Sequence, residues 1–363
     1  MTASKSGMLS LAPIRLLPLF LAAVPAAVLT DSPRLQVSMD AAEADAVLAI
    51  LAKQKAGARV EPADWERLFA TEGFRRLEAR EAVMKRPFTR EEFQAFVRSD
   101  ELAARAGALS STLERWKWLD TAAAAGRALA YLPEGAPIRA TVFPVIKPKP
   151  NSFVFSQPDP AIFLALDPAV TPEKLGNTLA HELHHIGFGA ACPPEDAGAE
   201  GLPKPKQEAL KWLSAFGEGF AMLAAAGGPD AHPHAASPAE ERQRWDRDME
   251  RADHDLRALD AFFQKVLEGR LAGEKADERG YSFFGIQGPW YTVGYRMAVS
   301  IEKAFGRAEL IRSFCDARRL PGAYNRAAER LGLPGARWSP AVAGAFSGSH
   351  GAATGGAAQR TDR

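Results

Sequence analysis

The sequence predicts an α+β fold that is mainly helical. Two observations lead to this prediction: residues 39–130 show helical patterns of apolar side chains, and residues 138–167 contain short β-branched and aromatic runs separated by turn residues. Helical patterns resume at Thr171 and continue along much of the remaining chain. An order of helices, a small sheet and further helices is typical of the α+β class.

The composition is that of an ordinary globular protein. The chain has 363 residues, of which 47% are hydrophobic and 25% are charged, enough to bury a large core. Its 45 basic and 44 acidic residues give a formal net charge of +1. This balance provides no electrostatic footprint for nucleic acid or for an anionic membrane surface, so we expect no nucleic-acid partner.

The N-terminal segment predicts a secretory signal peptide over residues 1–30. Lys5 and Arg15 are followed by the apolar run 16–29, and the first acidic residue is Asp31. The run is shorter than the ~20 residues that span a bilayer. We therefore expect export to the periplasm or the medium, with no stable membrane span after cleavage. An uncleaved anchor and an ordinary buried helix are the alternatives.

A helical N-terminal subdomain is predicted over residues 36–132. Its first helix can be capped by Ser38 or Asp40. Thr89 and Glu92 have the spacing of a capping box, in which each side chain bonds the other's backbone N–H. The sequence leaves open whether this part is a propeptide, a lid or an integral part of the fold.

The second predicted domain, residues 133–340, begins with the strands. Three are expected, over residues 138–148, 152–155 and 161–167. A helix then starts at Thr171, which is suited to the N-cap because Pro172 follows it. Gly187 and Gly189 predict the end of this helix.

Further helices and loops complete the second domain. Helices are expected up to about residue 226, over 238–270 and over 289–305, and the Gly/Ala/Ser-rich tail 344–363 is expected to be disordered. The chain has two cysteines, Cys192 and Cys315. Export would permit a disulfide between them, and two buried free thiols are the alternative.

The motif that carries chemistry is His181-Glu182-x-x-His185, in the stretch LAHELHHIGFG. A helical residue advances ~100°, so the two imidazoles lie about 40° apart, on one face and one turn from each other. That spacing lets both rings reach one zinc ion at ~2.0–2.1 Å. Glu182 flanks the pair at about 100°, where its carboxylate can reach a metal-bound water. His184 lies on the opposite flank, where a supporting or packing role is expected.

The rest of this helix supports the interpretation. Four apolar residues fall opposite the histidines, and they predict a buried stripe: Leu175, Leu179, Leu183 and Ile186. One face of the helix is therefore expected to pack, and the other to carry the metal site.

The third zinc ligand has to come from elsewhere in the chain, because catalytic zinc usually has three protein ligands. Glu218 is the best candidate: it is the only charged residue between Trp212 and Pro229, and a lone carboxylate in an apolar run is costly to bury unless it is paired or binds a metal. Gly217 and Gly219 beside it suggest that a helix or metal approaches closely. Other contenders are Glu195, Asp196, Glu200 and Glu208, with His232, His234 and His254 as weaker ones.

HELHH followed by a Glu-Gly helix resembles the gluzincin class of zinc metallopeptidases, of which thermolysin is the best-known type. More closely, it is similar to a group of exported bacterial proteins regarded as zinc-dependent proteases. The resemblance covers roughly residues 138–314 and implies a zincin-like catalytic domain. It also implies that residues 161–167 form the edge strand along which such enzymes bind an extended peptide.

The same resemblance implies roles for individual residues. His181, His185 and Glu218 would bind zinc, and Glu182 would be the general base. The interval between His185 and Glu218 is longer than in thermolysin.

A tyrosine is the predicted donor to the oxyanion of the reaction intermediate, because a hydroxyl group can serve there. In the resembled group a Tyr-x-x-Gly helix follows the Glu-Gly helix. Tyr291, four residues into GPWYTVGYR, is the first choice and Tyr295 the second. The alternative is that both tyrosines simply pack between helices.

These patterns predict a zinc-dependent metallopeptidase that hydrolyses peptide bonds through a zinc-activated water, with Glu182 as general base and a peptide or protein as substrate. Two alternatives remain open. One is a zinc hydrolase of another amide, such as a cell-wall cross-link. The other is a non-catalytic exported binding protein on a zincin scaffold, although Glu182 and both flanking histidines are present.

Overall fold

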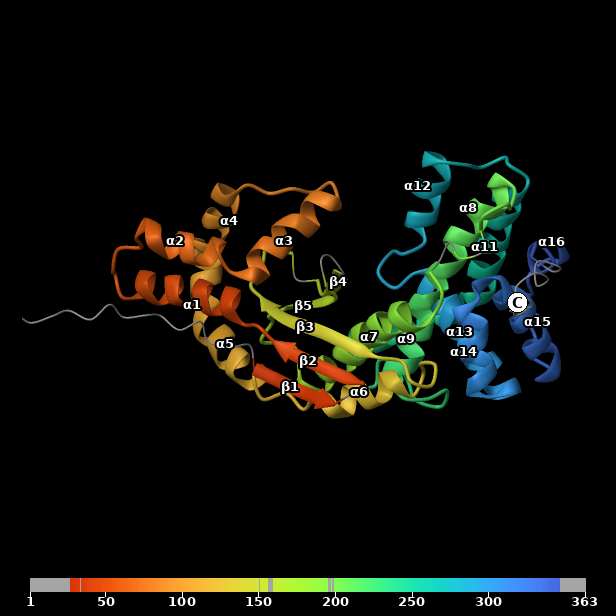
Figure 1. Ribbon diagram of the computed structural model, residues 1–363, viewed down its shortest axis with the longest axis horizontal. Helices are drawn as coiled ribbons and strands as arrows, with labels where there is room; N and C mark the ends of the chain where they lie inside the picture. Colours follow the sequence, from red (N-terminus) through yellow and green to blue (C-terminus); the bar gives the residue numbers. More distant parts are fainter. Residues whose placement is uncertain are drawn as a thin grey trace, which may run out of the picture.

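The computed structural model describes residues 27–32, 34–149, 151–155, 159–194, 197 and 199–346. Helices pack around one small mixed sheet in one half of the molecule and against one another in the other half, which confirms the predicted mainly helical α+β class (Figure 1). Buried apolar side chains form two core clusters, one around the sheet and one among the helices of the C-terminal half. The two predicted domains divide the chain at residue 133, whereas the first core includes residues from both sides of that position.

Five strands form the sheet in the order β1-β2-β3-β5-β4. They are β1 (Ala27–Ser32), β2 (Leu35–Met39), β3 (Ile138–Val145), β4 (Phe153–Phe155) and β5 (Ala161–Ala165). Parallel pairing joins β2 to β3 and β3 to β5. Antiparallel pairing joins each outer strand, β1 and β4, to its neighbour.

The sheet differs from the sequence-based expectation in two ways. The strand expected at the edge, β5, is internal, because β4 pairs along its outer side. Its run of buried residues fits a strand with neighbours on both sides. The sequence analysis also missed β1 and β2, although the alternating burial of Leu35, Val37 and Met39 is a strand pattern.

The N-terminal helices belong to the first core. They are α1 (Ala42–Lys55), α2 (Pro62–Phe69), α3 (Glu72–Val83), α4 (Arg90–Val97), α5 (Asp100–Trp116) and α6 (Thr121–Leu129). The predicted capping box starts α4: Thr89 Oγ1 accepts from Glu92 N at 3.1 Å, and Thr89 N donates to Glu92 Oε2 at 2.7 Å. Helices α1 and α3 approach β3 at Phe143. They therefore cover one face of the sheet.

Helix α7 (Pro172–Ala191) covers the opposite face of the sheet. It starts as predicted, with Thr171 Oγ1 accepting a hydrogen bond from Lys174 N at 3.2 Å. It continues past the predicted end, because Gly187 is a packing residue: an added Cβ there would collide with Leu132 and lie 3.0 Å from Ile138. Since Ile138 and Phe143 point to opposite faces of β3, α7 lies across the sheet from α1 and α3.

The helices of the second core follow. They are α8 (Lys204–Leu213), α9 (Gly217–Ala226), α10 (Ala239–Glu250), α11 (Ala252–Leu267), α12 (Glu274–Ser282), α13 (Pro289–Phe305), α14 (Arg307–Cys315), α15 (Leu320–Arg330) and α16 (Pro340–Ala343). The helix expected over residues 238–270 is thus two helices that meet at Arg251. Helices α12, α14, α15 and α16 were not placed by the sequence analysis.

Helices α9 and α13 cross with their backbones in direct contact. A Cβ added at Gly219 would lie 2.6 Å from Gly294 Cα and closer still to the peptide that joins Gly294 to Tyr295. By contrast, no atom of the described residues lies within 4 Å of a Cβ added at Gly217. The predicted close approach therefore holds for Gly219 and not for Gly217.

Cys192 and Cys315 form a disulfide. The bond joins the residue after α7 to the last residue of α14, across 123 positions of sequence. It therefore links the helix that carries the His-Glu motif to the second core.

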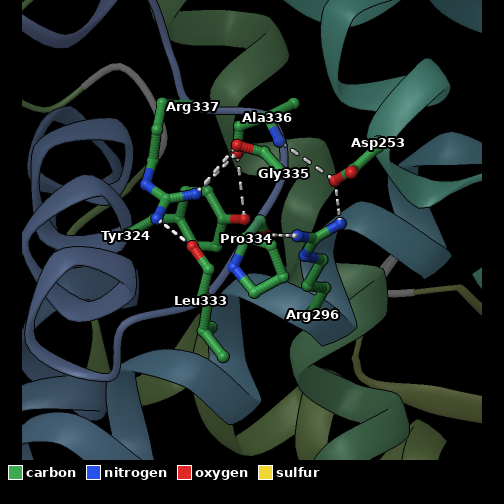
Figure 2. Close-up of polar contacts among 8 residues, drawn as sticks. All are labelled: Asp253, Arg296, Tyr324, Leu333, Pro334, Gly335, Ala336 and Arg337. Atoms are coloured by element: carbon green, nitrogen blue, oxygen red, sulfur yellow. Dashed lines mark hydrogen bonds and ion pairs between the residues drawn. The ribbon is translucent and has the colours of Figure 1, made fainter.

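Polar contacts fix the chain after α15 against α11 and α13 (Figure 2). Asp253 and Arg296 form an ion pair, and Asp253 Oδ1 accepts a hydrogen bond from Ala336 N at 3.1 Å. The Tyr324 hydroxyl donates to Ala336 O at 3.3 Å, and Arg296 donates to Pro334 O at 3.4 Å. These contacts brace the helix on which both predicted catalytic tyrosines lie.

Both predicted terminal segments lie mostly outside the described residues. Residues 27–30 of the predicted signal belong to β1, and residues 344–346 of the predicted tail are described, with Phe346 buried in the second core. None of the helices in the described part of the chain combines the length and apolar composition that crossing a bilayer requires.

Candidate metal centre

Helix α7 brings His181 and His185 together as the sequence predicts. Their Nε2 atoms are 3.0 Å apart, and their ring centroids are 4.7 Å apart. The side chains are 15% and 28% exposed, so a ligand can reach them. The apolar stripe on the other side of the helix is buried in the first core: Leu175, Leu179, Leu183 and Ile186.

Glu218, on α9, completes the cluster. Its Oε2 atom lies 3.3 Å from His181 Nε2 and 3.4 Å from His185 Nε2. Helix α9 belongs to the second core, whereas α7 belongs to the first, so the three side chains meet where the two cores join. In Figure 1 the two helices lie side by side between the halves of the molecule.

Glu182 and Tyr291 lie beside this cluster. Glu182 is 9% exposed and lines a pocket of about 290 Å³ together with His181 and Tyr291. Burial and the nearby Glu218 carboxylate raise the pKa of the Tyr291 phenol. Tyr295 points elsewhere, since its hydroxyl donates to Ala231 O at 3.1 Å. The structure therefore brings the first-choice tyrosine to the cluster and not the second.

A family model described as "Putative zinc dependent peptidase (DUF5700)" matches residues 65–332, more than half of the chain. The chain belongs to this family. No curated protein and no solved structure matches it. The family match starts within α2, so it includes most of the N-terminal helices as well as the residues 138–314 that carry the gluzincin resemblance.

The donor atoms of this DUF5700 chain have the spacing of a zinc site. Tetrahedral ligands at ~2.0–2.1 Å from zinc are about 3.3–3.4 Å from one another. The three separations among His181 Nε2, His185 Nε2 and Glu218 Oε2 are 3.0, 3.3 and 3.4 Å. Two imidazoles and one carboxylate are also a donor set of catalytic zinc sites, in which a fourth position stays open. The residues present therefore fit zinc.

The charges of the cluster favour a cation. Burial acts to raise the pKa of the Glu218 carboxyl, but His185 and His181 outweigh it and hold that pKa well below its usual range. Burial acts to lower the pKa of His185, but the Glu218 carboxylate outweighs it and raises the pKa to about 9. A metal would compete with the imidazole protons for this carboxylate, so metal affinity is expected to depend on pH.

Burial also affects the candidate general base. Loss of hydration raises the pKa of the Glu182 carboxyl, although His181 and His185 act in the opposite direction. A carboxyl group with a raised pKa is a better proton acceptor near neutral pH.

His184 has the packing role expected for the opposite flank. It is 1% exposed, its ring lies 4.6 Å from the ring of Phe220, and its Nε2 lies 3.4 Å from Tyr131 O. Burial holds the pKa of this imidazole well below its usual range, so it is neutral. Because Phe220 lies on α9, this contact packs α7 against the helix that carries Glu218.

The other contenders for the third ligand make different contacts or fall outside the described residues. Glu208 accepts a hydrogen bond from Trp212 Nε1 at 3.3 Å, and His232 lies 2.9 Å from Asp246. His254 is exposed and contacts Asp255. Glu200 is exposed in the loop before α8, whereas Glu195 and Asp196 lie outside the described residues. Within the described chain, the group suited to a metal is His181, His185 and Glu218.

Sequence reasoning underestimated His234, whose surroundings resemble an exposed loop. The side chain is 5% exposed and lines the same pocket as Glu182 and Tyr291. It is covered by Trp245 of α10, with ring centroids 5.2 Å apart, and burial lowers its pKa to about 4, which keeps it neutral. The local sequence does not predict this burial, because it depends on how α10 packs.

Proposed function

We propose that this member of the family is a zinc metallopeptidase of the gluzincin type, in which His181, His185 and Glu218 hold the ion. The observation that carries the proposal is the near-equilateral triangle of donor atoms, with edges of 3.0–3.4 Å. When bound, zinc supplies Lewis-acid chemistry that polarises a carbonyl group and makes water a nucleophile near neutral pH.

The remaining steps belong to side chains of this chain. Glu182 takes a proton from the attacking water on its carboxylate and then delivers the proton to the leaving amine. Tyr291 lines one pocket with His181 and Glu182, where its phenol is proposed to donate to the developing oxyanion. Loss of one such donor typically lowers the rate ~10²–10³-fold.

Metal analysis of the purified protein tests the ligands. We expect one zinc ion per chain, and we expect its loss in His181→Ala and Glu218→Ala. Glu208→Ala is the matched control, because Glu208 was a contender and bonds Trp212 instead. Full zinc occupancy in Glu218→Ala would remove Glu218 from the site.

Glu182→Gln tests the reaction. The variant should retain zinc, while hydrolysis of a peptide library falls ~10²–10⁴-fold, as expected when a general base is removed. Hydrolysis at the parental rate would refute the mechanism. If the zinc-loaded parent binds peptides and cleaves none, the non-catalytic binding protein becomes the better interpretation.

We also propose that the chain is exported. The basic and apolar N-terminal pattern supports this, and so does the Cys192–Cys315 disulfide, because disulfides form and persist mainly in oxidising compartments. Fractionation of cells that express the full chain tests the proposal. Accumulation of the uncleaved protein in the cytoplasm would contradict it.

A further inference from the structure

Two pockets of different character meet at the metal cluster. The larger, about 610 Å³, includes His185 and Glu218 and has several apolar walls: Phe188, Leu213, Phe284 and Phe314. The smaller, about 290 Å³, includes His181 and Glu182 and is otherwise almost entirely polar. A chain that lies across the cluster can therefore place one side chain in each pocket.

Apart from Glu182 and Glu218 at the cluster itself, the charged side chains that line the two pockets are paired. In the larger pocket, Lys211 forms an ion pair with Asp277, and Arg318 lies 2.6 Å from Asp316. Such pairing neutralises the charges that would otherwise attract a charged substrate side chain.

The smaller pocket shows the same balance. Lys174 Nζ lies 2.5 Å from Glu241 Oε1, and the neutral His234 contacts Ser237 Oγ at 3.1 Å. Burial acts to raise the pKa of the Glu241 carboxyl, but Lys174, Ser237 and His234 outweigh it and lower that pKa. Apart from Glu182, which is assigned to the reaction, this network makes the pocket polar without adding a net charge, so it suits an uncharged group that forms hydrogen bonds.

One segment contributes to both pockets. Tyr281 and Phe284 line the larger pocket and Gln287 lines the smaller one, with Ile286 between them, 74% exposed. Gln287 has a φ of +63°, which is uncommon for a residue other than glycine, and residues held in such conformations cluster at ligand sites. The segment 281–288 is thus a structured border of the cluster.

The shape of this segment is fixed at its C-terminal end. A Cβ added at Gly288 would lie 2.7 Å from Phe283 O, so the chain turns back tightly on itself. The indole N–H of Trp290, a fully buried residue, donates to Gly280 O at 2.9 Å. These contacts hold the pocket-lining side chains in place before a ligand arrives.

We propose that the segment 281–288 selects the substrate: a bulky apolar side chain binds the larger pocket against Phe284, and an uncharged hydrogen-bonding side chain binds the smaller pocket beside Gln287. The two side chains flank the bond that is cleaved. This inference rests on the proposed peptidase function, and it adds the substrate class, which is peptides with neighbouring apolar and uncharged polar residues.

Peptides that differ only at two central positions test the selection. The reference peptides contain Phe and Gln in either order, and the comparison peptides replace Phe by Ala, or Gln by Glu or Lys. We expect the better reference peptide to exceed each comparison peptide at least ~10-fold in kcat/KM, the order of discrimination that pocket contacts provide. Equal values for charged and uncharged peptides would overturn the proposal.

Two variants assign the selection to the segment. Phe284→Ala should reduce the discrimination between Phe and Ala peptides to less than about 3-fold. Phe305→Ala, the same substitution at the C-terminal end of α13, should leave it unchanged. Gln287→Gly, which tolerates the positive φ, should reduce the discrimination between Gln and Glu peptides alone. Melting temperatures confirm that each variant is folded, and unchanged discrimination in a folded Phe284→Ala would overturn the proposal.

Peptide binding to the zinc-loaded Glu182→Gln protein separates this inference from the proposed function. If the peptides bind with the expected order of affinities and the parent protein hydrolyses none of them, the substrate selection is supported and the peptidase function is refuted. If the parent hydrolyses peptides but the affinities do not follow the expected order, the peptidase function is supported and the substrate selection is refuted. Absence of both binding and hydrolysis would refute both.

Discussion

Replacing Gly219 by alanine tests whether the crossing of α9 and α13 positions Glu218, the proposed metal ligand. The added Cβ would lie 2.6 Å from Gly294 Cα and closer to the following peptide, and backbone atoms cannot rotate out of its way. Overpacking costs ~1–3 kcal/mol, and a backbone collision belongs at the upper end. Alanine gains ~1 kcal/mol over glycine in a helix. We therefore expect a net loss of about 2 kcal/mol or more, because the collision outweighs the helix preference.

Gly217→Ala is the matched control, since it lies on the other side of Glu218 and no described atom is within 4 Å of its added Cβ. It should be neutral or gain up to ~1 kcal/mol. For a chain of this size ~1 kcal/mol corresponds to about 2 °C, so Gly219→Ala should melt about 4 °C or more below the parent. Because the clash displaces α9, which carries Glu218, the zinc content of Gly219→Ala should also fall. Equal melting temperatures and full zinc in both variants would refute the reasoning.

Three further predictions follow from particular contacts. Tyr291→Phe should lower kcat ~10²-fold or more while zinc is retained. Tyr295→Phe should leave kcat unchanged and lower the free energy of unfolding by only ~1 kcal/mol, because it loses the hydrogen bond to Ala231 O. Equal losses of activity in the two variants would contradict this. The double substitution Cys192→Ser with Cys315→Ser should lower the free energy of unfolding by up to ~5 kcal/mol, given the 123-residue separation, and an unchanged urea midpoint would rule this out. Burial raises the pKa of the Glu43 carboxyl from 4.5 to about 8, so the folded chain keeps a proton that the unfolded chain loses between these values. The free energy of unfolding should therefore fall as the pH rises from about 4.5 to about 8. The melting temperature of Glu43→Gln should decrease less than that of the parent over the same pH range.

Most of the candidate metal centre could be predicted from the sequence. Helical periodicity alone placed His181 and His185 on one face, with an apolar stripe behind them, because these relations depend only on spacing along one helix. The cost of burying a lone carboxylate pointed to Glu218, and the structure brings its Oε2 within 3.4 Å of both imidazoles. Local chemistry pointed to all three residues of the candidate site.

The choice between Tyr291 and Tyr295 was decided only by the tertiary structure. Both lie on α13, one turn apart, and the sequence could not say which would meet the cluster. The contact of Gly219 with Gly294 sets how α13 crosses α9, and in that arrangement Tyr291 lines a pocket with His181 and Glu182 while Tyr295 bonds Ala231. A rotation of one helix against another depends on side chains far apart in sequence, so no local pattern contains it.

The sheet and the second pocket show the same division. The apolar run of β5 predicted a strand, but pairing with β4 made it internal. The position of a strand in a sheet depends on which other strands pair with it, and these come from other parts of the sequence. His234 lies in a loop with an exposed composition, yet Trp245 buries it beside Glu182. The sequence by itself determined the helix that carries the His-Glu motif and the chemistry of the candidate metal ligands, since both follow from residue type and spacing. The tertiary structure decided which other side chains reach the metal centre, since that depends on how the two cores meet.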